Sequence, residues 1–152
     1  MKRGQAAVEF LVTYGWAILI ILIAVSVLGY FDFLNPDRYT SQYCDTGPQI
    51  VCIEHFMDTG GTYSLVLRNN HNVDIRIDEI TVIVDEDEGS ISPFRQLQRG
   101  DSANFTVDLG AVQYTRGLNK QADIIVNFRR SGGTNNYDTI GSAIIRVQAP
   151  LT

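Results

Sequence analysis

Two copies of the sequence Asp-Thr-Gly, at positions 45–47 and 58–60, are the first residues in this chain whose type and spacing suggest catalysis. In aspartic proteases two such carboxylates share one proton across a cleft between two lobes or two subunits. Here Asp45 and Asp58 lie only 13 residues apart, and no lobe fits between them. Because Asp-Thr-Gly is also ordinary turn chemistry, we expect two surface turns here.

Metal binding is the second chemistry that the residue types suggest. The acidic run at positions 85–88, followed by Gly89, resembles a source of hard ligands for calcium, but it lacks the alternating ligand spacing of a calcium loop. His55 and His71 are not spaced with the two cysteines in a four-ligand zinc pattern. We therefore predict no metal site and no cofactor, an acidic surface turn, and two solvated histidines in strands or turns.

Composition narrows the function classes further. The chain has 152 residues and a formal net charge of −5, whereas a nucleic-acid partner calls for a basic face. It contains no phosphate-cradling glycine loop and no Ser-His-Asp set. The sequence therefore predicts that the protein is not an enzyme and does not bind nucleic acid.

A long apolar segment follows the N-terminus. Positions 10–31 carry no charged residue, and Glu9 and Asp32 flank them. As a helix these 22 residues reach about 33 Å, close to the ~30 Å hydrocarbon core of a bilayer. Lys2 and Arg3 precede the segment, so the positive-inside rule places the N-terminus in the cytoplasm and the remainder outside.

The alternative interpretation of this segment is a cleaved secretory signal. Such a signal has a shorter apolar region, and no small-x-small cleavage site follows Leu28. We therefore expect the helix to be retained, over 5–34, and to end at Asn35-Pro36 because proline disfavours helix at and before its position. A linker over 35–48 and one exported domain over 49–152 complete the predicted organisation.

After the linker the apolar residues follow a two-residue period, which is typical of strands. Turn residues such as Gly60-Gly61 and Gly132-Gly133 separate the strands, and no helical run lies between them. The chain is therefore predicted to be an α+β protein, a long N-terminal helix followed by an antiparallel β-sandwich of immunoglobulin-like or pilin-head type. The expected strands are 49–56, 62–69, 73–85, 103–109, 122–128 and 142–148.

Two of these strands carry additional information. The apolar phase of the third shifts from odd to even positions near Asp78-Glu79, which predicts a bulge or bend there. In the fourth, Phe105, Val107 and Leu109 are predicted to face the core.

Covalent modification is expected on the exported side. Cys44 and Cys52, an even pair outside the cytoplasm, fit one disulfide, although two unpaired small hydrophobes are the alternative. Asn104-Phe105-Thr106 is an N-glycosylation sequon, so Asn104 is expected to be exposed and is a candidate acceptor.

The N-terminal residues resemble a known processing signal. The order Lys2-Arg3-Gly4, Gln5, a glutamate at the fifth position after Gly4, and a long apolar helix resembles the class III signal peptide of archaeal type IV pilin-like proteins. The resemblance implies a leader over 1–4 that prepilin peptidase cuts between Gly4 and Gln5 on the cytoplasmic side. Archaellins of the same superfamily usually show a glycine-rich start, from which QAAVEF departs, so the resemblance favours a non-motility pilin.

The same resemblance implies a role for Glu9. A carboxylate at the membrane edge costs several kcal/mol when it is desolvated alone, so it needs a partner. Cleavage creates one, the α-ammonium of Gln5, which in an axially shifted neighbouring subunit would pair with Glu9. Phe10, Leu11 and Trp16 would then contribute apolar contacts to a bundle of helices.

The sequence thus predicts a structural subunit of an archaeal type IV pilus-like filament, a homo-polymer at the cell surface that mediates adhesion or surface contact. Its precursor would lie in the cytoplasmic membrane and use the pilus assembly machinery. Two alternatives remain open, a minor pilin and a membrane-anchored β-sandwich that recognises a sugar, solute or surface. Against the latter, the sequence shows no aromatic cluster at strand-end loops that would suggest a carbohydrate platform.

Overall fold

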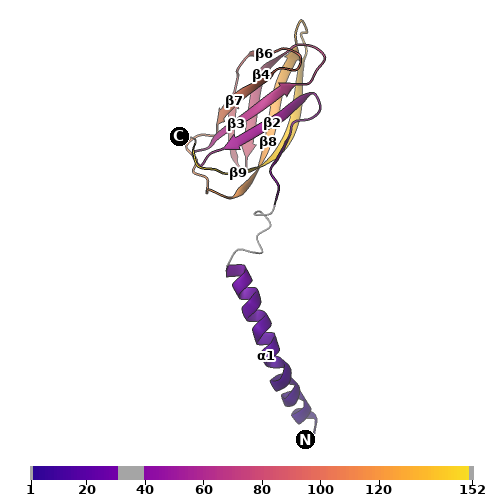
Figure 1. Ribbon diagram of the computed structural model, residues 1–152, viewed down its shortest axis with the longest axis vertical. Helices are drawn as coiled ribbons and strands as arrows, with labels where there is room; N and C mark the ends of the chain where they lie inside the picture. Colours follow the sequence, from indigo (N-terminus) through magenta and orange to yellow (C-terminus); the bar gives the residue numbers. More distant parts are fainter. Residues whose placement is uncertain (1, 31–39, 151–152) are drawn as a thin grey trace. The chain divides into compact units, whose positions relative to one another are not determined.

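The computed structural model describes residues 2–30 and 40–150, which belong to two separate compact units. The first unit contains one helix, α1 (Lys2–Tyr30), and the second, from Thr40 onward, contains all the strands (Figure 1). The predicted helix end at 31–34 and the Asn35-Pro36 stop lie outside the described residues.

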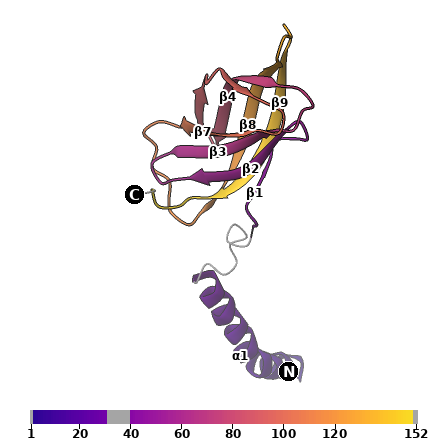
Figure 2. The same cartoon turned by 45° about the horizontal axis from the view of Figure 1, so that its top comes forward.

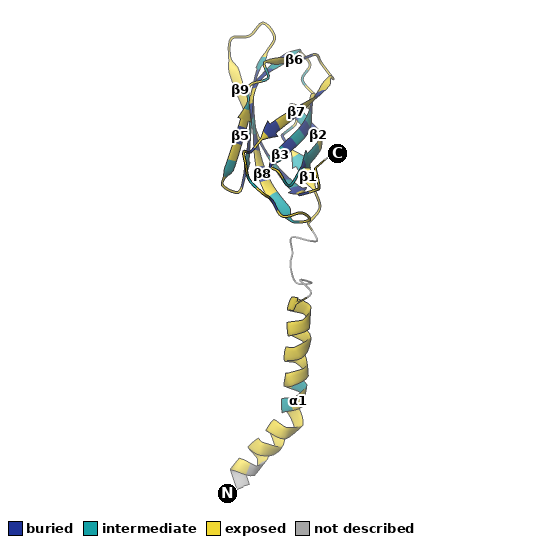
Figure 3. Ribbon diagram, turned by 90° about the vertical axis from the view of Figure 1, so that its left-hand side faces the viewer, coloured by how far each residue is buried: buried dark blue, intermediate teal, exposed yellow. Residues whose placement is uncertain are grey.

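The helix α1 is apolar around most of its circumference, because Leu, Ile, Val and Ala recur at every helical phase. The Thr13 and Ser26 side chains in the apolar segment bond within the helix. Thr13 donates to the carbonyl of Glu9 and Ser26 to that of Leu22, each at 2.7 Å. Such bonds to the preceding turn bend helices. Figure 3 shows α1 curving near its two intermediate residues, Gly15 and Ala17.

The second unit is an antiparallel β-sandwich, as predicted. One sheet has the order β1-β9-β8-β4-β5, with β6 also paired to β4, and the other has the order β2-β3-β7 (Figures 1 and 2). The strands are β1 (Tyr43–Asp45), β2 (Ile50–Met57), β3 (Thr62–Asn69), β4 (Ile75–Val84), β5 (Asp87–Ile91), β6 (Arg95–Leu97), β7 (Ser102–Asp108), β8 (Asn119–Arg130) and β9 (Asn136–Arg146).

The core lies between the two sheets. Figure 3 shows the sheets edge-on as two layers, with buried residues on the strands of both. The buried apolar residues of the two sheets form one core cluster. Side chains alternate along each strand between this core and solvent. In β7, Phe105 and Val107 are buried and Asn104 is exposed, and Leu109 just after it is buried too, which confirms the predicted faces.

The predicted irregularity in the third strand is a β-bulge. The pairing of β4 with β8 shifts register between Ile77 and Glu79, so Asp78 is the extra residue and the apolar side chains on both sides of it reach the same core. A second bulge, between Cys52 and Glu54 in β2, was not predicted. It leaves Ile53 exposed and turns His55 toward the core side.

The structure differs from the predicted linker. Strand β1 lies inside the range 35–48 and pairs with β9, after which the chain crosses to β2 in the other sheet. The short strands β5 and β6, which pair with β4, were also not predicted. Part of the acidic run is therefore strand: Asp85 has a positive φ of 56° at the turn, whereas Asp87 and Glu88 belong to β5.

The chain at the end of β1 passes so close to β9 that position 141 requires a glycine. A Cβ atom there would lie 2.6 Å from the Cα of Thr46 and would also collide with the carbonyl oxygen of Asp45. Both obstacles are backbone atoms, which cannot rotate away. We expect Gly141→Ala to lower the free energy of unfolding by about 1–3 kcal/mol, measured by urea denaturation in detergent micelles.

The matched control for this prediction is Gly60→Ala. A Cβ at Gly60 would meet its nearest atom, an oxygen of Asp58, at 3.4 Å, which is ordinary contact. Equal unfolding midpoints for the two variants would show that the contact of Gly141 with Asp45 and Thr46 is looser than the structure indicates.

Candidate functional site

The candidate functional site lies on the apolar helix α1, whose length is its first relevant property. Residues Ala6–Tyr30 form a stretch of 25 residues that is long and apolar enough to cross a membrane, and none of its most apolar window is buried. At 1.5 Å per residue it measures about 38 Å, more than the ~30 Å of a hydrocarbon core. The same length and composition are compatible with a membrane anchor or with a signal sequence.

The predicted assembly residues are all exposed on α1. Phe10 is 63% exposed, Leu11 71% and Trp16 64%. Phe10 also contacts Tyr14 one turn later, with ring centroids 4.6 Å apart. Consecutive residues on a helix point about 100° apart, so these side chains cover more than one face, as apolar contact with several neighbours requires.

The predicted cleavage position lies in the first turn of α1, which begins at Lys2. The first four backbone N–H groups of a helix have no intrahelical partner, so this turn is the least costly to unwind. A Cβ placed on Gly4 would meet no atom within 4 Å. Cleavage before Gln5 would place Glu9 just beyond the first turn of the shortened helix, where the helix dipole favours a negative charge only weakly.

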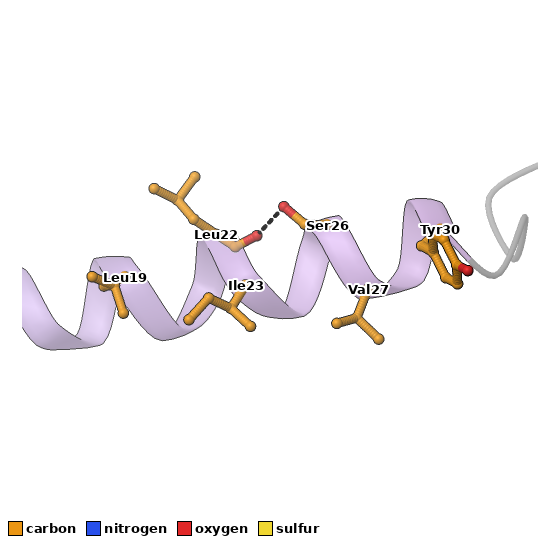
Figure 4. A pocket seen from close by; sticks show the side chains of 6 residues that line it. All are labelled: Leu19, Leu22, Ile23, Ser26, Val27 and Tyr30. Atoms are coloured by element: carbon orange, nitrogen blue, oxygen red, sulfur yellow. Dashed lines mark hydrogen bonds between the residues drawn. The ribbon is translucent and has the colours of Figure 1, made fainter.

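A shallow apolar groove lies on the second half of the helix. Figure 4 shows its lining side chains at successive turns along α1, and their spacing of three and four residues places them on one face of the helix. The Ser26 hydroxyl is directed to the carbonyl of Leu22. Because that hydroxyl is already satisfied, it adds little polarity to the groove. The lining residues are Leu19, Leu22, Ile23, Ser26, Val27 and Tyr30.

The two Asp-Thr-Gly sequences are turns. The Asp45 carboxylate accepts a hydrogen bond from the N–H of Gly47 and that of Asp58 from the N–H of Gly60, both at 2.9 Å. Asp45 pairs with Ser142, and Asp58 bridges to Gln148 six residues later, so the carboxylates lie roughly 20 Å apart along the strand direction. They cannot share a proton at this separation.

Cys44 and Cys52 form a disulfide whose Cα atoms are 5.8 Å apart. Cys44 lies on β1 in one sheet and Cys52 on β2 in the other, so the bond joins the two sheets directly at their common edge. It therefore fixes the segment that leads into the sandwich from the N-terminal side.

Removal of this disulfide is expected to destabilise the head. The bond closes a loop with a sequence separation of 8, and the chain-entropy estimate for such a loop is about 2.5 kcal/mol. A Cys44→Ser, Cys52→Ser double variant should lose this amount in urea unfolding. Its midpoint should also no longer respond to reductant. A native chain whose midpoint is unchanged by reduction would contradict the stabilising role.

Known proteins offer no assignment. No protein-family model matches the chain, and no curated protein matches it. The function must therefore be inferred from the residues and their geometry.

The histidines are not simply solvated. His55 is half-buried, and its Nδ1 lies 3.0 Å from the hydroxyl of fully buried Tyr63. Burial lowers the pKa of His55 and raises the pKa of Tyr63, so both members of this hydrogen-bonded pair favour their neutral forms. His71 is also half-buried, 5.3 Å from the ring of Phe128, and its pKa is lowered by burial and by the charge of Arg130.

The lowered histidine pKa values predict a loss of stability in mild acid. The folded chain binds these protons less well than the unfolded chain. The contribution of the two neutral histidines to the free energy of unfolding is therefore complete above the ordinary pKa of 6.5. It decreases as the pH falls from 6.5 toward the lowered pKa values of the folded chain. Unfolding at pH 7.5 and pH 5 should show this loss. The His55→Gln, His71→Gln double variant should lose less over the same interval, and an equal loss would contradict the assignment.

The bulge in β4 holds an ion-pair cluster that the sequence analysis missed. The carboxylate of Asp78 accepts a hydrogen bond from Nε of Arg76 at 2.7 Å and one from Nε of Arg129 at 2.6 Å. Burial opposes ionisation of Asp78, but these two guanidinium groups hold its pKa below the ordinary value. The phase shift at Asp78 was the available signal, since a bulge redirects the extra side chain.

The predicted glycan acceptor and the acidic run are the remaining candidate sites from the sequence. Asn104 is exposed on the outer face of β7, as a glycan acceptor must be. Asp87 accepts a hydrogen bond from the hydroxyl of Tyr114 at 2.7 Å. Within residues 2–30 and 40–150, no group of three or more His, Cys, Asp or Glu side chains could hold a metal ion.

Proposed function

We propose that the protein is a structural subunit of an archaeal type IV pilus-like surface filament. The observation that carries the proposal is α1, a helix of membrane-spanning length whose large apolar side chains are exposed. Exposed apolar surface of this extent marks a membrane or protein contact. An anchor before assembly and a filament core after assembly use the same surface.

Glu9 supports this proposal over a simple anchor. An anchor gains nothing from a carboxylate beside the bilayer, whereas an assembling helix with a free N-terminus gains an ion pair with a neighbouring subunit. In the proposed sequence of events, prepilin peptidase cuts between Gly4 and Gln5 at the cytoplasmic side. The assembly machinery then moves the helix, with its new α-ammonium, out of the membrane and against Glu9 of the next subunit.

The groove over Leu19–Tyr30 would receive the same segment of another subunit. Its apolar lining and the small side chain of Ser26 allow a neighbouring helix to approach closely. Contacts of this kind are heterologous, because one face of the helix meets a different face of its neighbour. A heterologous contact whose rotation does not close gives an open helical polymer.

The head would then lie at the cell surface. The disulfide between Cys44 and Cys52 suits an oxidising compartment, and the exposed sequon at Asn104 suits exported glycosylation. With the N-terminus inside, these groups lie outside the membrane both before and after assembly.

Immunogold microscopy on filaments sheared from cells tests the proposal. Label along the whole length of the filaments is expected for a principal subunit, and label confined to one end would identify a minor pilin. A chain found only in the membrane fraction would contradict the proposal and would favour an anchored binding module.

A further inference from the structure

The positive charge of the sandwich is concentrated at one end. Six of the nine Lys and Arg residues within 40–150 lie there, although the whole chain has a net charge of −5. The start of β4, the end of β8 and strand β6 meet at this end, which we call the arginine end. The six residues are Arg68, Arg76, Arg95, Arg99, Arg129 and Arg130.

A hollow of about 240 Å³ lies at the arginine end. Gln96, Arg76 and Arg129 are directly opposite one another on β6, β4 and β8, so they form one row across the sheet. Arg130 and the glycine hairpin 131–133, between β8 and β9, complete the lining.

Asp78 orients two of these guanidinium groups. Its side chain is only 8% exposed, and each of its oxygens accepts one Nε–H, from Arg76 and from Arg129. Each guanidinium keeps its two Nη groups as donors for a second acceptor. One carboxylate faces three arginines, so the hollow retains a positive charge that is held in a fixed geometry.

Aromatic rings stand beside two of the arginines. The guanidinium of Arg76 lies 5.9 Å from the ring centroid of Phe94, and that of Arg130 lies 5.2 Å from the ring of Tyr137. Phe94 is 63% exposed and has a positive φ of 45°, an unfavourable conformation for a bulky residue. The arginine end thus combines anion donors with two aromatic rings, one of which, Phe94, is largely exposed.

We propose that this hollow binds a carboxylate or sulfate group of an acidic polysaccharide. Paired guanidinium groups match the planar fork of a carboxylate or two oxygens of a sulfate. The exposed ring of Phe94 offers apolar surface to the C–H face of a sugar. The hollow is smaller than the about 300–1,000 Å³ of pockets that enclose a drug-sized ligand, so it suits one acidic group on an extended polymer.

The acidic end of another head is the competing occupant. That end contains the turn at 85–88, but Asp85 is paired with Lys120 and Asp87 accepts the hydroxyl of Tyr114. Two of its carboxylates are therefore already engaged, which makes a carbohydrate the better match. The inference goes beyond the filament role and does not depend on it, because every residue involved lies in the sandwich.

Binding to defined polymers tests the proposal with the full chain in detergent micelles. The probes are polygalacturonate, which carries carboxylates, and dextran sulfate, which carries sulfates. Neutral dextran is the control. We expect binding to at least one charged polymer and none to dextran. Arg130→Gln should weaken that binding at least about tenfold, since a charged hydrogen bond is removed from the hollow. The two charged polymers distinguish carboxylate from sulfate recognition.

Arg116→Gln is the matched control, because it removes one exposed positive charge away from the hollow. It should leave the affinity within about twofold, whereas Arg130→Lys, which keeps charge but not the fork, should give an intermediate loss. Arg130 does not pair with Asp78, so unfolding midpoints should stay similar. Equal losses of affinity in Arg130→Gln and Arg116→Gln would overturn the proposal, and so would a native chain that binds neither charged polymer. Self-association of the chain that Arg130→Gln abolishes would also overturn it, because the occupant would then be another copy of the chain.

Discussion

Replacing Glu9 with glutamine is expected to reduce filament yield at least tenfold while leaving membrane insertion and leader cleavage intact. Glutamine has nearly the same shape but no charge, so the helix and its apolar contacts remain. What is lost is the partner for the α-ammonium of Gln5 in the neighbouring subunit. Leaving one member of a buried ion pair alone costs about 3–5 kcal/mol, and each 1.4 kcal/mol is a factor of ten.

The measurement is the ratio of subunit in the sheared fraction to subunit in the membrane fraction. Glu54→Gln is the matched control, since it makes the same chemical change at an exposed position of the head. Normal yield from the Glu9 variant would remove the ion-pair account of this residue. Loss of the subunit from both fractions would indicate failed insertion, which the account does not predict.

Replacing Gly4 with valine is expected to block leader processing almost completely, so that uncut precursor accumulates in the membrane. The structure makes this substitution informative, because a Cβ at Gly4 meets no atom within 4 Å and the new side chain therefore begins in open space. Only an enzyme that must fit around this residue would detect the branched side chain. Intact mass of the membrane-extracted chain shows whether residues 1–4 are still present.

Gly15→Val serves as the control for processing. It makes the same substitution in the same helix, where a Cβ also meets no atom within 4 Å, but far from the proposed cut. The account requires normal cleavage in this variant and none in Gly4→Val. Normal maturation of both would mean that the resemblance to a class III signal peptide is misleading.

Periodicity predicted the long elements of this fold well. The long apolar run after Glu9 predicts a helix. The two-residue alternation in β3, β4 and β7 predicts which face of each strand is buried. The phase shift at Asp78 identified the bulge correctly. These signals are local, since each depends on residues within one strand or a few helical turns.

The missed elements have no local signal. Strand β1 has three residues, and its partner β9 lies about a hundred positions later, so only the folded sandwich reveals the pairing. The acidic run was predicted as turn, yet Asp87 and Glu88 extend a hairpin from β4 because register overrides their low strand propensity. The first residues of β9, from Asn136, are mostly polar and lie outside the predicted strand 142–148.

The candidate sites divide in the same way. The N-terminal residues Gly4, Gln5 and Glu9 form a linear motif, which a sequence displays without folding. The arginine end is not visible as a linear motif, because Arg76 and Arg129 are 53 positions apart and become neighbours only through the pairing of β4 with β8. The negative net charge of the chain gave no indication of the arginine end either, since a net charge does not show where the positive residues lie.

N-terminal sequencing combined with intact mass, on filaments sheared from cells, tests the central claim most directly. The account predicts polymeric material whose subunit begins at Gln5 and retains the apolar helix Ala6–Tyr30. A subunit that still begins at Met1, or one cut after the helix and found outside any filament, would contradict both the processing and the assembly role of the N-terminal segment.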